Sequence, residues 1–316
     1  MKKILSLWVL ALVGVLFAKE DIVVFHAGSL AVPFSQIEKA FEKKSPNYDV
    51  KREVSGSRKA ARKVSDIGRK ADVVASADYK VIDNLLIPQN AKFNLQFATN
   101  EMAIAYTDNS KFHTEFNAEN WTEIVLREGV KVGHSNPNSD PCGYRSMLVT
   151  KLAGKYYKKP DFFKDLLGYK EMYKVGDERK SRVVVRPKET DLLALLQVHA
   201  LDYLYIYKSV AQQHGLKYIT LPKEISLKDG EFDTLYNSVS FNISGKKPGE
   251  SICEKGGAMV YGMTIPQNST SPLNAKGAVA FVNFVLSKEG SEIMKKNGQG
   301  VLSPAIISGD STVLKR

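Results

Sequence analysis

The segment SNPNSDPCGYRS, residues 135 to 146, combines residue types that build ligand-binding loops with one acid, Asp140. A second acid, Glu189, stands in Pro187-Lys188-Glu189, directly after an apolar run. Both acids lie where a helix is expected to begin. Considered singly, Asp140 is best explained as a helix N-cap and Glu189 as a surface acid that complements the helix dipole. A role for both acids in binding chemistry therefore needs support from other parts of the chain.

Two loops nearer the N-terminus share another pattern, in which a strand is followed by Gly-Ser and then by a helix. They contain Gly28-Ser29 and Ser55-Gly56-Ser57. Helix N-termini present unpaired N–H groups and the positive end of the helix dipole, so two such ends facing one cleft form a site for a compact anion. Each serine taken alone is an ordinary N-cap. Tyr207 ends the run DYLYIY and could turn its hydroxyl into the same cleft or pack in a core.

The order of these patterns predicts an α/β protein with parallel strands covered by helices. Extended runs are expected at residues 21–25, 48–54, 71–76, 131–134, 182–185, 202–207 and 258–265. The last of these runs, AMVYGMTI at 258–265, resembles the apolar segment EMAIAY at 101–106, and together they enter and leave the middle of the chain, as an inserted lobe requires. We expect lobe 1 to comprise 19–106 plus 258–316 and lobe 2 to comprise 107–257, with a cleft between them. Two consecutive independent domains are the alternative.

The N-terminal residues 1–18 read as a signal peptide. Lys2 and Lys3 precede an apolar run from Ile4 to Phe17, and Ala18 offers a cleavage point. No cysteine near that point could take a lipid, so we expect an exported, periplasmic protein. The formal charge of the 316-residue chain is +11, and removal of the two lysines leaves +9. Lys and Arg are dispersed, which disfavours nucleic acid as a partner and suits capture of a small anion.

The common nucleotide, hydrolase and metal signatures GxxxxGK[ST], GxSxG, HExxH and CxxC are missing from the sequence. We therefore expect no cofactor and no enzymatic activity. Two cysteines, Cys142 and Cys253, leave a disulfide open, since an exported protein can keep one.

Six segments taken together resemble the periplasmic molybdate/tungstate-binding proteins of ABC transporters, in particular the tungstate-binding branch. The resemblance runs from about residue 21 to 300, and Cys253 is a departure from the family pattern. The segments are FHAGSL, VSGSRKAARKVSDIGRKADVVASADY, SNPNSDPCGYRS, RPKETDLLALL, LDYLYIYKSVAQQHG and YGMTIP.

The resemblance implies a two-lobed type II periplasmic-binding-protein fold that closes on a tetrahedral oxyanion. It also implies a monomer that delivers molybdate or tungstate to a membrane permease. The implied oxyanion-binding positions are Gly28, Ser29, Ser57, Asp140, Pro141, Cys142, Glu189 and Tyr207.

The resemblance also gives the two acids a role, because in this branch they are thought to coordinate the Mo or W atom itself. A carboxylate facing sulfate meets only like charge, whereas one that reaches an electron-poor, expandable metal centre becomes a ligand. Asp140 and Glu189 would then select against sulfate. The alternatives are another oxyanion such as sulfate or phosphate, or ferric iron, on the same fold. A hydrolase using the two acids with a serine nucleophile is the enzyme alternative, although His26 is the only histidine in the strand-end loops that would form the cradle.

Overall fold

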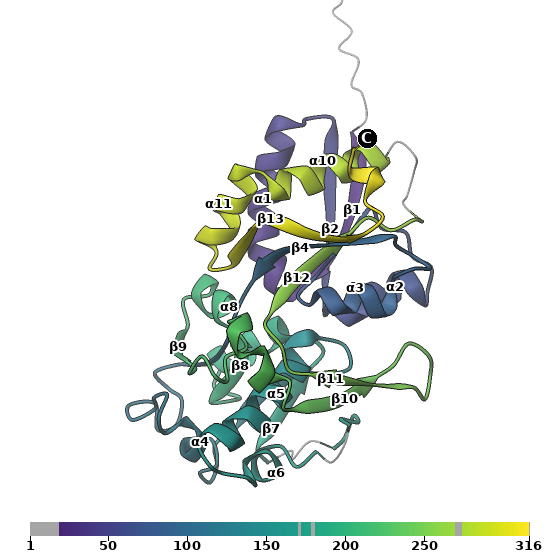
Figure 1. Cartoon of the computed structure of the whole chain (residues 1–316). Helices are drawn as coiled ribbons and strands as arrows, with labels where there is room; N and C mark the ends of the chain where they lie inside the picture. Colours follow the sequence, from purple (N-terminus) through teal and green to yellow (C-terminus); the bar gives the residue numbers. More distant parts are fainter. Residues whose placement is uncertain (1–18, 170–171, 178–180, 269–273, 316) are drawn as a thin grey trace, which may run out of the picture.

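The computed structural model describes residues 19–169, 172–177, 181–268 and 274–315. Two lobes, each built around a mixed sheet with helices on its faces, lie one above the other in Figure 1. The predicted signal peptide lies outside the described residues. Among the described residues, no helix is long and apolar enough to cross a membrane.

Thirteen strands and eleven α-helices occur in the described residues, together with four short 3-10 helices. The strands are β1 Glu20–Ala27, β2 Tyr48–Ser55, β3 Val73–Ser76, β4 Phe93–Thr99, β5 Met102–Tyr106, β6 Val132–Ser135, β7 Val183–Arg186, β8 Tyr203–Tyr207, β9 Lys217–Thr220, β10 Ser240–Ser244, β11 Ser251–Lys255, β12 Val260–Thr264 and β13 Gly300–Gly309. The α-helices are α1 Ala31–Lys44, α2 Ser57–Ser65, α3 Tyr79–Leu85, α4 Trp121–Ile124, α5 Pro141–Tyr156, α6 Phe162–Leu166, α7 Leu193–Gln197, α8 Lys208–Gln213, α9 Asp233–Tyr236, α10 Asn274–Leu286 and α11 Lys288–Lys296. The 3-10 helices are η1 Gly28–Leu30, η2 Glu189–Leu192, η3 Gly230–Phe232 and η4 Thr312–Lys315.

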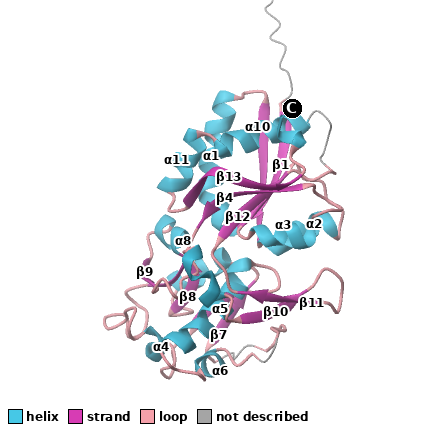
Figure 2. Cartoon of the chain, in the orientation of Figure 1, coloured by secondary structure: helices cyan, strands magenta, loops and turns pink. Residues whose placement is uncertain are grey.

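The first lobe contains a six-stranded sheet in the order β13-β4-β12-β3-β1-β2, so both ends of the chain contribute to it. Strand β1 shows why the sheet is covered on both faces. Its alternate residues Ile22 and Val24 belong to the core that also contains α1 and α10 residues, whereas Phe25 packs in a second core with residues of α2 and α3. Figure 2 shows helices on either side of this sheet.

The second lobe contains a five-stranded sheet in the order β7-β6-β8-β5-β9. Strand β6 runs parallel to β7 and β8, and β5 runs antiparallel to β8 and β9. Helix α5 packs on this sheet, and its residues from Pro141 to Thr150 are all buried, with the polar Arg145, Ser146 and Thr150 among them. Strands β10 and β11 form a separate antiparallel hairpin.

The expected secondary structure is largely present, with differences at the hinge and at the C-terminus. The segment 102–106, which we expected in lobe 1, is strand β5 of the five-stranded sheet, so the first connection between the sheets is Asn100-Glu101. In place of the helix expected to begin at Glu189, the chain forms a 3-10 turn, η2, followed by the short helix α7. After the last expected extended run, at 258–265, the chain forms α10, α11 and an edge strand, β13, that was not expected.

Candidate functional site

The predicted site residues lie at the carboxyl ends of five strands, where open α/β sheets bind ligands. Gly28 and Ser29 follow β1, Ser57 follows β2, and Asp140 comes after β6. Glu189 follows β7, and Tyr207 is the last residue of β8. Strand ends of both sheets are therefore turned toward the boundary between the lobes.

Close contacts bring residues of the two lobes together at this boundary. A Cβ added to Gly28 would lie 2.8 Å from Oε1 of Glu189. A Cβ added to Gly56 would lie 2.4 Å from the carbonyl oxygen of Ser139 and 3.0 Å from Cβ of Asp140. Glycine is needed at both positions because the backbone of one lobe approaches the acidic loops of the other.

The serine hydroxyls of the first lobe are not helix caps. The N-cap residues of α1 and α2 are Leu30 and Gly56, and neither makes a side-chain capping bond. Ser29 Oγ instead accepts a hydrogen bond from Tyr261 Oη at 2.9 Å. Ser57 Oγ accepts one from the Ala77 backbone N–H at 2.9 Å. Both serines are buried, so the N-cap interpretation does not explain them.

Asp140 is both an N-cap and a bridge to the second acid. It precedes α5, and its Oδ1 accepts from the Cys142 N–H at 3.3 Å. Its Oδ2 accepts from the Glu189 N–H at 3.0 Å. Burial raises the pKa of Asp140, and hydrogen bonds to its carboxylate oppose that rise. The capping interpretation was therefore correct for one carboxylate oxygen, and the other fixes the backbone of Glu189.

Glu189 is the unusual acid of the site. Glu189 is 1% exposed, and neither of its carboxylate oxygens has a hydrogen-bond partner of ordinary geometry among the described residues, although the Asp140 carboxyl group and its own backbone N–H lie close enough to shift its pKa. Burial, and next the negative charge of Asp140, raise the pKa of Glu189 well above its usual range. Its interpretation as a solvated surface acid is therefore wrong. Buried carboxylates are normally paired, so an unpaired one beside Gly28 marks a position prepared for a ligand.

The remaining predicted residues complete the second-lobe side. Pro141 occupies the first turn of α5, where its missing N–H has no cost. The Cys142 thiol is buried, which raises its pKa, and its Sγ lies 3.7 Å from the Tyr205 carbonyl oxygen. Tyr207 is fully buried, and its Oη accepts from Arg145 Nη1 at 3.0 Å. Cys142 and the exposed Cys253 are both free thiols.

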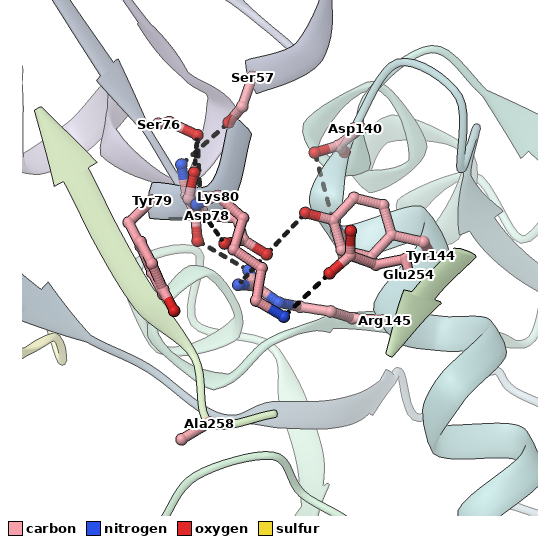
Figure 3. A network of polar contacts seen from close by, with 12 residues as sticks. Ser57, Ser76, Asp78, Tyr79, Lys80, Asp140, Tyr144, Arg145, Glu254 and Ala258 are labelled. Carbon is pink, nitrogen blue, oxygen red and sulfur yellow. Dashed lines mark hydrogen bonds and ion pairs between the residues drawn. The ribbon is translucent and has the colours of Figure 1, made fainter. Parts of the chain in front are cut away.

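A polar network that sequence reasoning missed joins the two lobes beside these residues (Figure 3). Asp78 Oδ2 accepts from Tyr144 Oη at 2.7 Å and lies 3.0 Å from Arg145 Nη2. Arg145 Nη1 also donates to the Ala77 carbonyl oxygen at 2.7 Å. We call Asp78, Tyr144 and Arg145 the inter-lobe network. Asp78 is also the N-cap of α3, since its Oδ1 accepts from the Lys80 N–H at 3.0 Å.

A second set of contacts joins α2 of the first lobe to loops of the second. Arg58 Nε donates to the Asn138 carbonyl oxygen at 3.1 Å, and the Lys59 N–H donates to the Ser139 carbonyl oxygen at 3.2 Å. Arg58 and Arg62 also donate to the carbonyl oxygens of Ser244 and Gly245 in the β10–β11 hairpin. The lobes are therefore closed on each other, and the predicted site lies inside the closed boundary.

The site can supply a definite set of groups to a small ligand: hydroxyls from both lobes and two buried carboxylates. Among the described residues, no group of three or more His, Cys, Asp or Glu side chains is arranged to hold a metal ion. The chemistry on offer is hydrogen-bond donation to an anion, with two carboxylate oxygen ligands near it.

Similarity to known protein families identifies the family of this chain. It belongs to the bacterial extracellular solute-binding protein family, whose pattern it matches over residues 22–299. Membership in this family implies a role in binding and transport of a solute.

Individual relatives cover nearly the whole chain. An uncharacterized solute-binding protein of Petrotoga mobilis is 51% identical over 297 residues, which are 93% of this chain and 88% of the relative. The molybdate/tungstate-binding protein WtpA of Pyrococcus abyssi is 44% identical over 305 residues, which are 92% of this chain and 87% of the relative.

Two solved structures share the fold at low sequence identity. The periplasmic molybdate-binding protein of Azotobacter vinelandii matches with a TM-score of 0.61 and 15% identity, over 88% of this chain and 98% of that one. The sulfate-binding protein SubI of Mycobacterium tuberculosis matches with a TM-score of 0.58 and 14% identity, over 94% of this chain and 89% of that one. These likenesses confirm the predicted two-lobed periplasmic-binding-protein fold.

Proposed function

We propose that this chain captures molybdate or tungstate outside the cytoplasmic membrane and delivers it to an ABC transporter permease. The observation that carries the proposal is Glu189, a fully buried acid without a hydrogen-bond donor, set against Gly28 and beside Asp140. The name of the Pyrococcus abyssi relative supports the same ligand. The ligand is cargo, and no cofactor takes part.

The proposed roles follow from the hydrogen bonds already described. Ser29, Ser57 and Tyr207 donate their hydroxyl protons to oxygens of the oxyanion, and the loops at Gly28 and at Pro141-Cys142 form the walls around it. Asp140 and Glu189 each contribute one oxygen to the metal atom, which raises its coordination from four to six. Metal coordination would relieve the cost of keeping Glu189 buried, since the carboxylate then has a positively polarised partner.

We further propose that the two lobes meet at the connections 100–101 and 256–259 and close by rotation there around the ligand. The mature protein would act as a periplasmic monomer after removal of residues 1–18. The closed form would be the one that the permease recognises.

Calorimetry of the mature protein with molybdate, tungstate, sulfate, phosphate and ferric citrate tests the function. We expect tight binding of the first two only. Comparable binding of sulfate would contradict metal coordination by the acids, and binding of ferric citrate alone would replace the proposal by iron transport. X-ray absorption at the Mo or W edge then counts the oxygens, with six expected and four contradicting the role of Asp140 and Glu189.

A further inference from the structure

A directed chain of hydrogen bonds runs from the hinge to Ser29. It begins at the backbone N–H of Glu101, which donates to Asn100 Oδ1 at 2.9 Å. A backbone N–H can only donate, so this bond fixes which end of the Asn100 amide is the oxygen. Asn100 Nδ2 then donates to Tyr261 Oη at 2.8 Å and to Ser209 Oγ at 2.7 Å.

Tyr261 connects Asn100 to the predicted ligand site, because its hydroxyl accepts from one residue and donates to the other. Its phenol has one proton, and its oxygen already accepts from Asn100, so the proton is donated to Ser29 Oγ at 2.9 Å. Asn100, Tyr261 and Ser29 are all buried, which shields the chain from competing water. Among the hydrogen bonds between described residues, none is donated by Ser29 Oγ. The Ser29 proton is therefore left for an acceptor beyond the described residues, such as a bound ligand.

We infer that Tyr261 is a positioning residue that, held by Asn100, makes Ser29 an obligatory donor to the bound oxyanion. The inference rests on the proposed function, because it takes Ser29 as a ligand-binding residue. Molybdate and tungstate carry acceptor oxygens only, so a hydroxyl with a fixed outward proton fits them without having to reorient on binding.

The chain also ties the orientation of Ser29 to the placement of the lobes. Tyr261 belongs to β12 of the first sheet, Asn100 lies in the connection to the second sheet, and Ser209 belongs to α8 beside that second sheet. Gln299, from the C-terminal part of the first lobe, donates to both the Ser29 carbonyl oxygen and Ser209 Oγ at 3.2 Å. These bonds make the back of the site one continuous structure across the hinge.

The same arrangement recurs at the other two predicted hydroxyls, which supports the inference. Ser57 Oγ accepts from the Ala77 N–H, and Tyr207 Oη accepts from Arg145. Each hydroxyl thus accepts a bond from the protein side and keeps its own proton for another acceptor. Tyr261 offers the cleanest test, because Arg145 also takes part in the inter-lobe network.

The test is a double-mutant cycle on molybdate affinity, measured by calorimetry with Tyr261→Phe, Ser29→Ala and the double variant. We expect Ser29→Ala to weaken binding more than tenfold and Tyr261→Phe to weaken it about fivefold. If Tyr261 acts through Ser29, the double variant binds as Ser29→Ala does. Equal affinity of Tyr261→Phe and the natural protein, or independent effects that multiply in the double variant, would overturn the inference.

Two further variants separate this inference from stability and from the proposed function. Tyr205→Phe removes another fully buried tyrosine hydroxyl, one bonded to Thr150 Oγ1 at 2.8 Å, and is expected to leave affinity unchanged. If Ser29→Ala itself leaves affinity unchanged, the proposed site is wrong, and the positioning of Ser29 falls with it.

Asn100→Asp serves if Tyr261→Phe fails to fold. The substitution replaces the donor to Tyr261 by an acceptor, which turns the tyrosine proton away from Ser29. We expect about tenfold weaker molybdate binding that is reduced or lost in a Ser29→Ala background. The added negative charge would instead weaken binding equally in both backgrounds, and that result would count against the inference.

Discussion

Two buried carboxylates at the lobe boundary, Asp78 and Glu189, have opposite surroundings. Asp78 accepts hydrogen bonds from Tyr144 and the Lys80 N–H and pairs with Arg145. Glu189 is at least as buried, at 1% against 4% exposed, yet it meets no donor among the described residues. Burial alone therefore does not tell a structural acid from a binding acid. The presence or absence of protein partners does, because a buried acid without partners is either protonated, as the raised pKa of Glu189 indicates, or compensated by a group from outside the chain.

The largest expected effect comes from Glu189→Gln. We expect molybdate affinity to fall about 100-fold, roughly 3 kcal/mol, because a neutral amide is a poor ligand for Mo. Stability of the unliganded protein should not decrease, since the variant removes an unpaired buried acid. Calorimetry and thermal unfolding measure the two quantities. Glu119→Gln, at an exposed position, is the matched control, and unchanged affinity of Glu189→Gln would remove the difference between the two acids.

The next largest effect concerns a buried group that is not an acid, His26, and the dependence of folding stability on pH. Burial lowers the pKa of His26 from 6.5 to about 4; a contact with the Ala27 carbonyl opposes this, and the positive charge of Arg52 adds to it. Between pH 6.5 and 4 the unfolded chain binds the proton and the folded one does not, so stability falls as pH falls through this window. The loss from this group is about 2 kcal/mol between pH 7 and 5.

Denaturant unfolding at several pH values, compared between the natural protein and His26→Gln, isolates this contribution. We expect the variant to show a shallower pH dependence above pH 4. Identical slopes for the two proteins would show that His26 does not resist protonation when folded.

Asp78→Asn should have a smaller and different effect from Glu189→Gln. It leaves Arg145 without its buried partner in the closed form, so closure around any ligand becomes less favourable. We expect about tenfold weaker binding of molybdate, roughly 1.4 kcal/mol, with the ratio of molybdate to sulfate affinity unchanged. A changed ratio would mean that Asp78 also contacts the ligand.

The smallest expected effect is that of Tyr144→Phe. It removes one neutral donor to Asp78 and leaves the ion pair with Arg145 in place. We expect a loss of about 1 kcal/mol or less in the stability of the ligand-bound protein, measured by denaturant unfolding with saturating molybdate. If Tyr144→Phe lowered the stability of the ligand-bound protein by more than Asp78→Asn does in the same unfolding experiment, the tyrosine and not the ion pair would hold the lobes together.

The sequence indicated the strand ends of the site well, because a strand followed by Gly-Ser or by Asp-Pro is a local signal. Ser57 and Asp140 could thus be found from their neighbours alone. The link between Asp140 and Glu189 came from family resemblance, since 49 positions separate them and no spacing rule connects them. The pairing of Arg145 with Asp78 was missed for the same reason, because it joins the two lobes.

The fold differences arise where the local sequence pattern is weak. The run 102–106 is apolar throughout, and all of β5 except Tyr106 is buried, so no alternation showed which sheet it would join. Strand β13 was missed because Gly300, Pro304 and Gly309 interrupt a largely exposed edge strand. Short buried segments and irregular edge strands are decided by neighbours that are distant in the sequence.

The register of the first sheet has a consequence for how such a protein could be built. Thr99, the last residue of β4, pairs directly with Val260, the first residue of β12. The chain thus leaves and re-enters the sheet at one antiparallel pair, whose Cα atoms are typically about 5 Å apart. A turn of two or three residues would be enough to join these positions. The whole second lobe can therefore be regarded as an insertion into a single hairpin of a smaller, contiguous α/β domain.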